Sequence, residues 1–460
     1  MKAIRIMLMA LLIMSGTVAQ VRSQIFVGAT EIDTSTVVTG LYTPWEILWG
    51  PDDHIWITER NGRISRLNPG TGSITELIFI DVHEWNEGGL LGMVLHPDFP
   101  EQPYVYVVYN YQETTMKERL ARYTYSNGEL ISPVTLLEGI AGAATHNGSR
   151  LVIDSNYKLY MTTGDSGNPS FSQDLSSLNG KVLRMNLDGS VPEDNPFQGS
   201  YIWSWGHRNA QGLVISPQGI MYSSEHGPSN DDEVNIIEKG RNYGWPEVMG
   251  YCSEPEELQF CSDSNVVEPI AAWTPTLAVA GTDFYHHTAI PEWGNTLLVT
   301  SLKASVLTAL SLSPDGRSVI MEEMYFEDWF GRLRDLCISP DGRIFLAVSN
   351  LDGRGDDRPG DDRIVEIAAK NSGPLEVRPG SEGDIRVYPN PVSGNEVQLQ
   401  YSLEKEAQLR IYSQDGKEIS RSILFPGNRQ VSIQLPGTSG IYNLIISSQE
   451  GTRHLRVLKL

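Results

Sequence analysis

The sequence predicts an all-β protein, a six-bladed β-propeller followed by a small C-terminal β-sandwich. A unit of one tight turn and one short strand recurs along the chain, which is typical of blade-like repeats. The chain also contains 43 glycines and 26 prolines, which suit many turns, and it has no long helical pattern. Its 460 residues exceed what one ordinary core can fill unless the fold is repetitive.

Four copies of the turn-strand unit are recognisable. Turn-forming residues such as Pro-Asp-Gly fix the chain reversal, and the β-branched and aromatic residues that follow favour a strand. The spacing is consistent with one blade per roughly 50–60 residues and some degenerate copies, giving about six blades. The propeller would occupy residues 25–370; a large array of β-sandwiches is the alternative. The copies are Gly50–Glu59, Ile153–Met161, Ser216–Tyr222 and Ser339–Ala347.

The N-terminus predicts an export signal over residues 1–19. Lys2 and Arg5 precede the apolar run Ile6–Met14, which is too short to cross a bilayer, and Ala19 supplies a small residue at the expected cleavage point. No later stretch is long and apolar enough for a transmembrane helix. The net charge of −22 repels phosphate backbones, so nucleic acid is not an expected partner, and it suits a soluble exported protein.

The three cysteines divide into a pair and a single residue. Cys252 and Cys261 flank a short polar loop, which predicts a disulfide in an exported chain, with two unpaired loop thiols as the alternative. Cys337 lies in an apolar stretch and is expected to be a buried structural thiol.

The amino-acid composition changes after Lys370. Residues 371–383 are rich in glycine, proline and serine and are interpreted as a linker. Residues 384–460 contain several short strands whose alternation predicts a small sandwich with one solvated face. They carry no visible catalytic constellation. The predicted strands include Val397–Tyr401, Ala407–Tyr412, Val431–Leu435 and Tyr442–Ile446.

Four cations are expected at strand ends, namely Arg208, Lys303, Arg332 and Arg334. Arg332 and Arg334 flank one residue, so an extended chain points both to the same side, where they can hold a planar polycarboxylate. Each cation alone is also compatible with a surface or salt-bridge role. Together, in so acidic a chain, they favour a polyanionic ligand.

His146 and Asp165 are a candidate proton-transfer pair. His146 precedes a predicted strand and Asp165 follows it. Because a strand sends its ends to opposite rims, loops must bring the two residues together. If they meet, Asp165 would hold one imidazole nitrogen and leave the other as a base. The alternative is an unrelated loop histidine and turn aspartate.

The segment after Ser224 is dense in oxygen donors. Gly227 and Pro228 offer main-chain carbonyls, and residues 231–233 offer three carboxylates. Calcium accepts about six to eight such oxygens in irregular geometry, although the spacing is not an EF-hand. A solvated acidic loop is the alternative. The later run Gly353–Arg363 has balanced charges and is interpreted as an exposed loop, with a further ion site as the alternative.

Residues 40–370 resemble the soluble glucose and aldose sugar dehydrogenases that depend on pyrroloquinoline quinone (PQQ). The order and coverage of the matching stretches make the resemblance specific. The stretches are Gly88–Gly92 with His96–Phe99, Gly180–Ser190, Gly206–Asn209 with Gln211–Leu213, Glu225–Glu233, Asn242–Pro246, Ser301–Lys303 and Arg332–Asp335.

The resemblance implies a six-bladed propeller with the quinone on its axis. It makes His146 the general base, Asp165 its orienting partner and Arg208 the residue over the quinone. The residues that would bind the carboxylates and ring oxygens of the cofactor are Asn209, Lys303, Arg332 and Arg334.

The same resemblance implies two Ca²⁺ sites. Gly227 and Pro228 would give carbonyls to a calcium that contacts the quinone, and Glu233 and Tyr243 resemble ligands of a second, structural calcium. Ser253 stands where the glucose enzymes offer an acidic ligand, which would weaken this second site. The stretch between Tyr251 and Pro275 is short beside those enzymes, which suggests a more open pocket and looser sugar choice.

Glu87 is a further cofactor-site residue and a departure from the family pattern. The glucose enzymes usually carry glutamine near the cofactor at this position. An extra carboxylate beside an anion is expected to weaken binding unless it is protonated or faces away.

The tail resembles the C-terminal sorting domain of type IX secretion cargo. The resemblance implies passage through the outer membrane, followed by release or surface attachment; a carbohydrate-binding or adhesive β-module is the alternative. The matching residues are Val387–Pro391, Ile411 and Tyr412 with Gly416, Gly440–Tyr442 and Val457–Leu460.

These features together predict an exported quinoprotein that oxidises aldoses at the anomeric hydroxyl to lactones and passes electrons to an external acceptor. A binding propeller without turnover and a calcium-dependent, lactonase-like hydrolase are the alternatives. A hydrolase would need no quinone, and the cationic cluster argues against it.

Overall fold

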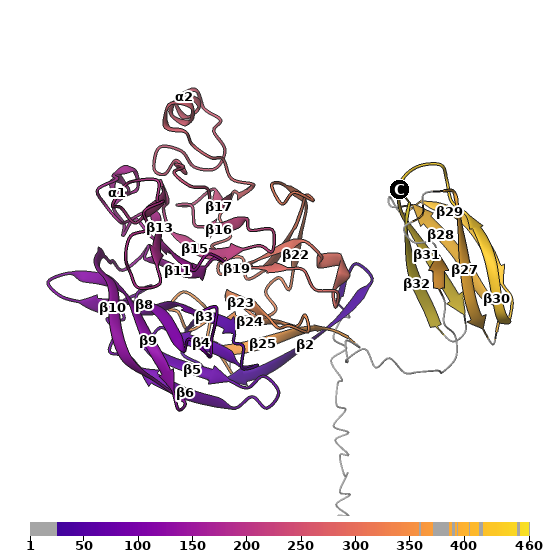
Figure 1. Ribbon diagram of the computed structural model, residues 1–460, viewed down its shortest axis with the longest axis horizontal. Helices are drawn as coiled ribbons and strands as arrows, with labels where there is room; N and C mark the ends of the chain where they lie inside the picture. Colours follow the sequence, from indigo (N-terminus) through magenta and orange to yellow (C-terminus); the bar gives the residue numbers. More distant parts are fainter. Residues whose placement is uncertain are drawn as a thin grey trace, which may run out of the picture. The chain divides into compact units, whose positions relative to one another are not determined.

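The structure is a computed structural model that describes residues 25–357, residues 360–370 and, with short gaps, residues 386–459. The predicted signal segment 1–19 and linker 371–383 lie outside the described residues. The chain divides into two compact units after Ser372 (Figure 1), and each unit is described by itself.

Six antiparallel sheets make up the described part of the first unit. The first sheet contains β3 (Pro44–Trp49), β4 (Ile55–Glu59), β5 (Arg63–Leu67) and β6 (Ile74–Phe79). The second contains β7 (Leu90–Leu95), β8 (Tyr104–Gln112), β9 (Met116–Ser126) and β10 (Glu129–Ala141). The third contains β11 (Gly148–Ile153), β12 (Lys158–Thr163), β13 (Lys181–Asn186) and β14 (Ile202–Trp205).

The other three sheets follow in chain order. The fourth contains β15 (Ala210–Ile215), β16 (Met221–Glu225), β17 (Asp232–Ile236) and β18 (Ala271–Trp273), and the fifth β19 (Val279–Tyr285), β20 (Thr296–Ser301), β21 (Leu307–Leu312) and β22 (Val319–Tyr325). The sixth joins both ends of the unit. It combines β23 (Leu333–Ile338), β24 (Ile344–Val348) and β25 (Arg363–Ala369) with β2 (Thr30–Thr39) and β1 (Ile25–Val27).

The first strands of the six sheets pack side by side in a closed ring, in the order β3, β7, β11, β15, β19, β23 and back to β3. Close approach requires glycine on some of them. A Cβ on Gly92 of β7 would lie 1.9 Å from the Ser149 carbonyl oxygen of β11, and one on Gly281 of β19 would lie 1.9 Å from a carboxylate oxygen of Asp335 on β23. No other residue type fits these positions without displacing the neighbouring strand.

The apolar core is divided among the spaces between neighbouring sheets. Trp56 of the first sheet packs with Leu90 of the second, and Ile55 of the first with Phe345 of the sixth. Four further clusters fill the other four spaces in the same way. Each sheet therefore buries both faces, which explains why its strands are largely apolar rather than strictly alternating.

The recurring turn-strand unit has a defined place in this architecture. The predicted strands of the four copies correspond to β4, β12, β16 and β24, the second strand of their sheets. Each turn joins the first strand to the second. The corresponding connections of the other two sheets, residues 96–103 and 286–295, are longer than the four or five residues that join these strands in the recognised copies. They were therefore not recognisable as tight turns.

Buried charges link strands of the ring. Arg150 of β11 lies 2.6 Å from Glu46 of β3 and 3.0 Å from Asp335 of β23, and it donates to the Gln211 carbonyl of β15 at 2.9 Å. Burial raises the pKa of Glu46 to about 8, although Arg150 opposes the effect. Removing one partner would leave the others buried and unpaired, which is costly.

Helices are few in the described residues. They are α1 (Ser170–Gln173), α2 (Pro255–Ser264) and the 3₁₀ turn η1 (Pro291–Trp293). Figure 1 shows α2 on a loop that projects from the strands of its sheet. None of the described helices is long and apolar enough to cross a membrane.

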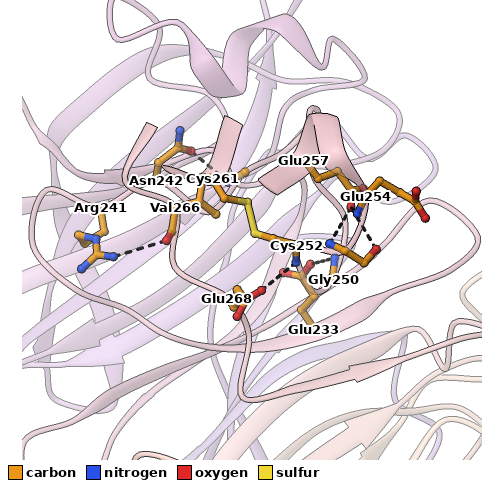
Figure 2. The surroundings of a disulfide bond; sticks show 12 residues. Glu233, Arg241, Asn242, Gly250, Cys252, Glu254, Glu257, Cys261, Val266 and Glu268 are labelled. Carbon is orange, nitrogen blue, oxygen red and sulfur yellow. Dashed lines mark hydrogen bonds between the residues drawn. A yellow bond between two sulfur atoms is a disulfide. The ribbon is translucent and has the colours of Figure 1, made fainter. Parts of the chain in front are cut away.

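A disulfide between Cys252 and Cys261 closes the loop that carries α2 (Figure 2), which confirms the predicted bridge. Just before the bridge, the N–H of Gly250 donates to Glu233 at 2.6 Å. The bridge therefore anchors the projecting loop close to the acidic segment. Cys337 is buried as predicted.

The run Gly353–Arg363 is not simply an exposed loop, and this interpretation was wrong for its final part. Asp362 is fully buried, and its carboxylate accepts N–H groups from Asn350 at 2.6 Å and Thr43 at 3.0 Å. Burial raises the pKa of Asp362 to about 6. The balanced charge of the sequence concealed an aspartate that ties two loops together.

The second unit contains two sheets within its described residues. One has β26 (Arg386–Tyr388), β27 (Glu396–Leu403) and β30 (Gly427–Gln434); the other has β28 (Ala407–Ser413), β29 (Glu418–Leu424), β31 (Gly440–Ser448) and β32 (Gly451–Lys459). Residues such as Leu399, Leu409 and Leu444 form one shared core. The four strands named from the sequence correspond to β27, β28, β30 and β31, whereas β26, β29 and β32 were not named.

Glu118 on β9 is a buried acid without a partner. It is fully buried, and neither carboxyl oxygen has a hydrogen-bond partner among the described residues. Burial raises its pKa well above the usual value. Burial without a partner therefore favours the protonated form of this group in the folded protein.

Replacing Glu118 with glutamine is expected to stabilise the protein at pH 7 by up to about 3 kcal/mol. The unfolded chain releases the Glu118 proton above its usual pKa of 4.5, whereas the folded chain retains it, so unfolding becomes easier as pH rises. Urea unfolding at several pH values would show a gain that grows from pH 5 to pH 8. A variant less stable than the wild type across this range would contradict the assignment.

Candidate active site

A cavity of about 480 Å³ lies at one end of the ring of first strands. Residues near the start of those strands line it: Trp45 (β3), Leu91 (β7), Gly148 (β11), Gln211 (β15) and Arg334 (β23), with Ala278 just before β19. All six first strands therefore begin at this cavity. Its volume is typical of a small-molecule or cofactor site.

Most of the residues selected from the sequence meet here. The cavity wall includes Glu87, His146, Arg208, Gly227, Pro228, Lys303, Arg332 and Arg334. Asp165 and Asn209 do not line the cavity but stand behind it. Asp165 holds His146, and Oδ1 of Asn209 accepts hydrogen bonds from Gly148 at 3.1 Å and Gln211 at 3.0 Å.

His146 and Asp165 are in direct contact, with Nδ1 of His146 2.7 Å from Oδ1 of Asp165. One strand was expected between the two residues, which would place them at opposite rims of the sheet. This expectation was wrong, because two strands separate them. His146 precedes β11, Asp165 follows β12, and this hairpin returns the chain to its starting rim. Asp165 is fully buried and also accepts the indole N–H of Trp245 at 2.9 Å. Nε2 is the ring nitrogen left for proton transfer.

The loop that carries His146 is held in an uncommon conformation. His146 has a φ of +62°, in the left-handed region, and its carbonyl accepts the N–H of Ser166 at 3.2 Å. A Cβ on Gly164 would lie 1.8 Å from that carbonyl oxygen. Glycine at position 164 therefore lets the two loops meet and brings the imidazole to Asp165.

The cavity has more cations than carboxylates. Among the described residues, six cationic side chains and three carboxylates line it. Asp352 is shared, since its Oδ2 lies 2.7 Å from Arg332 and 3.5 Å from Arg334. Burial lowers the pKa of Arg334 to about 10, so it remains charged at neutral pH. The cations are Arg60, Arg208, Lys303, Arg332, Arg334 and Arg354, and the carboxylates are Glu87, Asp232 and Asp352.

Several donors around this wall lack acceptors. Nε of Arg208, Nε of Arg334 and Nδ2 of Asn209 are buried without a hydrogen-bond partner among the described residues. Burial also lowers the pKa of Arg208. Desolvated donors and excess positive charge are what a bound polyanion would satisfy.

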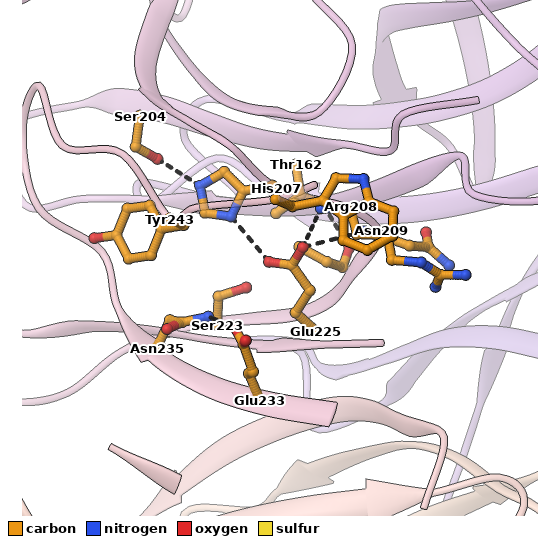
Figure 3. A network of polar contacts seen from close by, with 12 residues as sticks. Thr162, Ser204, His207, Arg208, Asn209, Ser223, Glu225, Glu233, Asn235 and Tyr243 are labelled. Atoms are coloured by element: carbon orange, nitrogen blue, oxygen red, sulfur yellow. Dashed lines mark hydrogen bonds and ion pairs between the residues drawn. The ribbon is translucent and has the colours of Figure 1, made fainter. Parts of the chain in front are cut away.

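A polar network positions Arg208 and Asn209 (Figure 3). The His207 ring lies between Ser204 and Glu225, at 2.9 Å from each, and stacks on Tyr243 with ring centroids 4.5 Å apart. Glu225 also accepts the backbone N–H groups of Arg208 and Asn209. The guanidinium of Arg208 in turn lies 5.2 Å from the Trp245 ring and donates to the His226 carbonyl at 3.1 Å.

The oxygen-rich segment is folded rather than solvated. Asp232 is fully buried and accepts the N–H groups of Gly227 at 2.8 Å and Val279 at 3.2 Å. It therefore shapes the turn that presents the carbonyls of Gly227 and Pro228. A separate void of about 10 Å³ lies nearby, bordered by Glu225, Asp231, Glu233 and Tyr243 among others.

The acidic side chains around that void are engaged with protein groups. Glu233 accepts the N–H of Gly250 and, at 2.9 Å, the amide of Asn235, and burial raises its pKa to about 8. The Tyr243 hydroxyl donates to the Ile236 carbonyl at 2.6 Å. The main-chain carbonyl oxygen of Tyr243 is therefore the atom of this residue left to bind an ion. Among the described residues, no three side chains of histidine, cysteine, aspartate or glutamate converge as a metal cluster.

Sequence reasoning missed Arg60, His226, Asp352 and Arg354 in the cavity wall. His226 had a signal, since it adjoins Gly227. Burial, with repulsion from Arg334 and Arg208, lowers its pKa to about 3, so the ring is neutral. Asp352 and Arg354 lie in or beside the run interpreted as an exposed loop.

The fold and the site define a class: a ring of β-sheets with a cation-rich axial cavity beside a carboxylate-oriented imidazole. Comparison with known proteins identifies the family. The glucose/sorbosone dehydrogenase family matches residues 41–355, and the chain belongs to it.

Relatives of this family match along most of their own length. Quinoprotein glucose dehydrogenase B of Acinetobacter calcoaceticus is 33% identical to this chain, and the alignment covers 75% of this chain and 90% of that protein. An aldose sugar dehydrogenase of Escherichia coli is 28% identical, and the match covers 72% of this chain and 94% of that protein. The PQQ-bound aldose sugar dehydrogenase of Streptomyces coelicolor superposes with a TM-score of 0.65 at 32% identity and covers 74% and 98%.

The second unit belongs to a different family. Residues 386–459 match the secretion system C-terminal sorting domain. This domain points to the type IX machinery as a partner and to secretion or the cell surface as the destination.

Replacing Gly164 with alanine is expected to destabilise the protein by about 1–3 kcal/mol, because the new methyl group overlaps the His146 carbonyl. Gly70→Ala is the control, since its nearest neighbour would lie 3.4 Å away. Urea unfolding of both variants measures the difference. Equal stability of the two variants would show that the contact does not constrain the loop.

Proposed function

We propose that the protein is a quinoprotein that oxidises aldose sugars at the anomeric hydroxyl to lactones, with PQQ and Ca²⁺ in the axial cavity. Electrons then pass to an external acceptor. The observation that carries this proposal is the excess of cations in the cavity beside the His146–Asp165 pair. The glucose and aldose sugar dehydrogenases among its relatives support the substrate class.

The residues present fit the quinone. PQQ is a flat tricarboxylate, and the wall offers three more cations than carboxylates. The unpartnered Nε atoms of Arg208 and Arg334, two residues of the cavity wall, need acceptors, which quinone and carboxylate oxygens provide. Asn209 would support the cofactor from behind the wall, through its hydrogen bonds to Gly148 and Gln211. Lys303 and Arg332 would hold further carboxylate oxygens, with Arg208 over the quinone.

The protein side of the reaction rests on His146. PQQ, when bound, supplies the two-electron acceptor for the hydride that leaves C1 of the sugar. Nε2 of His146 accepts the proton of the C1 hydroxyl, which lets the C1–O bond become the carbonyl of the lactone. Asp165 fixes the ring and stabilises the imidazolium that forms.

Calcium is assigned to the carbonyls of Gly227 and Pro228, where a hard cation would polarise a bound oxygen as a Lewis acid. Glu233 and the main-chain carbonyl of Tyr243 are the proposed ligands of a second ion. The void of about 10 Å³ is close to the size that admits one small species. Ser253 contributes no carboxylate, and its hydroxyl donates to Glu257 at 3.2 Å.

The domain assignment follows from the same reasoning. We infer that the six sheets are the blades of a propeller over residues 25–370 and that residues 384–460 form a sandwich. A signal peptide over residues 1–19 would direct export, and the type IX machinery would act on the sorting domain after the linker 371–383. The expected destination is the medium or the cell surface.

The second candidate function is a binding propeller without turnover. Glu87 favours it, because an extra carboxylate near the cofactor would weaken cofactor binding. Its charge is opposed by Arg354 at 2.9 Å, which weakens that objection. The cation excess likewise favours an anionic cofactor over a lactonase-like hydrolase, which needs none.

Reconstitution is the direct test of the proposed function. The full chain is incubated with Ca²⁺ and PQQ, an aldose is added, and an electron-acceptor dye is followed by absorbance. Sugar-dependent bleaching is expected. If quinone binds but a broad panel of sugars and alcohols gives no turnover, the protein is a binding propeller rather than a sugar dehydrogenase. Lactone hydrolysis without quinone would favour the lactonase-like hydrolase.

Replacing His146 with glutamine is expected to lower kcat by roughly 10²–10⁴-fold, because the variant lacks the proton acceptor. Quinone affinity should stay within a few-fold of the wild type, since the cations are unchanged. Steady-state kinetics and a spectroscopic quinone titration measure the two quantities separately. Near-normal turnover of His146→Gln would refute the base assignment.

A further inference from the structure

Glu87 and Arg354 form an ion pair in the cavity wall that the proposed reaction leaves without a role. Oε1 of Glu87 lies 2.9 Å from Nη2 of Arg354, and both residues line the cavity. The side chains are 27% and 55% exposed, so the pair stands where the cavity meets solvent. Because its charges cancel, the pair adds little to the net charge that would hold the cofactor.

The second carboxylate oxygen of Glu87 reaches the catalytic loop. Oε2 accepts the backbone N–H of His146 at 3.2 Å, and the N–H of Glu87 donates to the Ala144 carbonyl at 2.9 Å. Two hydrogen bonds thus join the loop before β7 to the loop before β11. A carboxylate is a stronger acceptor than a neutral oxygen, so the bond to His146 is a charge-assisted one.

His146 is a residue for which such support matters. Its left-handed φ of +62° is an unfavourable conformation for a residue with a Cβ. Asp165 holds its ring, Ser166 holds its carbonyl and Glu87 holds its N–H. Without Glu87 the loop keeps two of these three anchors, and the imidazole can shift by a fraction of an ångström.

Arg354 has donors beyond those that Glu87 can accept. A guanidinium carries five N–H donors in a plane, and the single contact with Glu87 keeps this group at the edge of the cavity with other donors left over. Hydroxyl oxygens of a sugar are suitable acceptors. The carboxylate–guanidinium pair has no net charge and offers both donors and acceptors, so it suits the hydroxyl groups of a neutral polyol.

We propose that Glu87 is a positioning residue for His146 and that Arg354 recognises the hydroxyl groups of a neutral sugar at the cavity mouth. The second half of this inference rests on the proposed function, whereas the first half concerns the free protein. Glu87 thereby links substrate recognition to the placement of the base.

Hydrogen exchange on the full-length protein without quinone tests the positioning role. In Glu87→Ala, the amide of His146 should exchange about tenfold faster, a change equivalent to one lost hydrogen bond. Glu87→Gln keeps an oxygen acceptor, although a neutral one, and should retain most of the protection that Glu87→Ala loses. Unchanged exchange in Glu87→Ala would overturn the role, whether or not the protein oxidises sugars.

Kinetics of the holoenzyme then separate the two residues. Glu87→Ala should lower kcat about 100-fold through misplacement of the base, with rescue by Glu87→Gln. Arg354→Gln should raise KM for neutral aldoses about tenfold with little change in kcat. Arg119→Gln is the matched control, because it breaks a comparable ion pair. That pair joins Arg119 of β9 to Glu138 of β10.

Calorimetric titration of glucose into holoenzyme whose quinone has first been reduced measures sugar affinity independently of turnover, because the reduced cofactor cannot accept a hydride. The Arg354→Gln variant should bind about tenfold more weakly than the wild type and Arg119→Gln. Equal affinity of all three proteins would overturn the recognition role. Absence of wild-type turnover with normal sugar binding would count against the proposed function but not against either residue's role.

Discussion

Excess positive charge in the axial cavity is the physical constraint on which the account depends. The chain carries a net charge of −22, yet six cations and three carboxylates meet where the first strands begin. Burial lowers the pKa values of Arg208 and Arg334, which shows that the folded chain holds these cations away from water. Such an arrangement is unfavourable without an anion, so the architecture anticipates one.

The ring of sheets makes this concentration of charge possible. Glycines at the closest approaches let first strands pack against one another, and Arg150 with Glu46 and Asp335 ties three of them below the cavity. The loops before and after the strands then need only a few residues to place side chains on the axis. His146 and Asp165 reach each other in this way, through one hairpin and one glycine contact.

The elements with strong local signals were predictable from the sequence. Turn-strand units with Pro-Asp-Gly or related turns predicted the second strands of four sheets. The spacing of Arg332 and Arg334 predicted that both point to the same side, and both contact Asp352 in the structure. The disulfide followed from loop length and export. The resemblance to sugar dehydrogenases assigned most of the remaining site residues, which composition alone had left open.

What could not be predicted depends on contacts between distant segments. The connections between the first two strands of the second and fifth sheets are longer than those of the other four sheets, so no compact turn-strand unit marks these strands in the sequence. Balanced charges in the run Gly353–Arg363 gave no hint that Asp362 is buried or that Arg354 faces Glu87, far earlier in the chain. A hairpin rather than one strand between His146 and Asp165 also reversed the expected geometry.

Calorimetric titration with PQQ and with its trimethyl ester tests the central claim most directly, because the two ligands share shape and ring oxygens but differ in three negative charges. The account predicts one-to-one binding of the triacid and at least roughly 100-fold weaker binding of the ester, with the triacid's affinity falling as salt is raised. Equal binding of both ligands, or binding of neither, would contradict it.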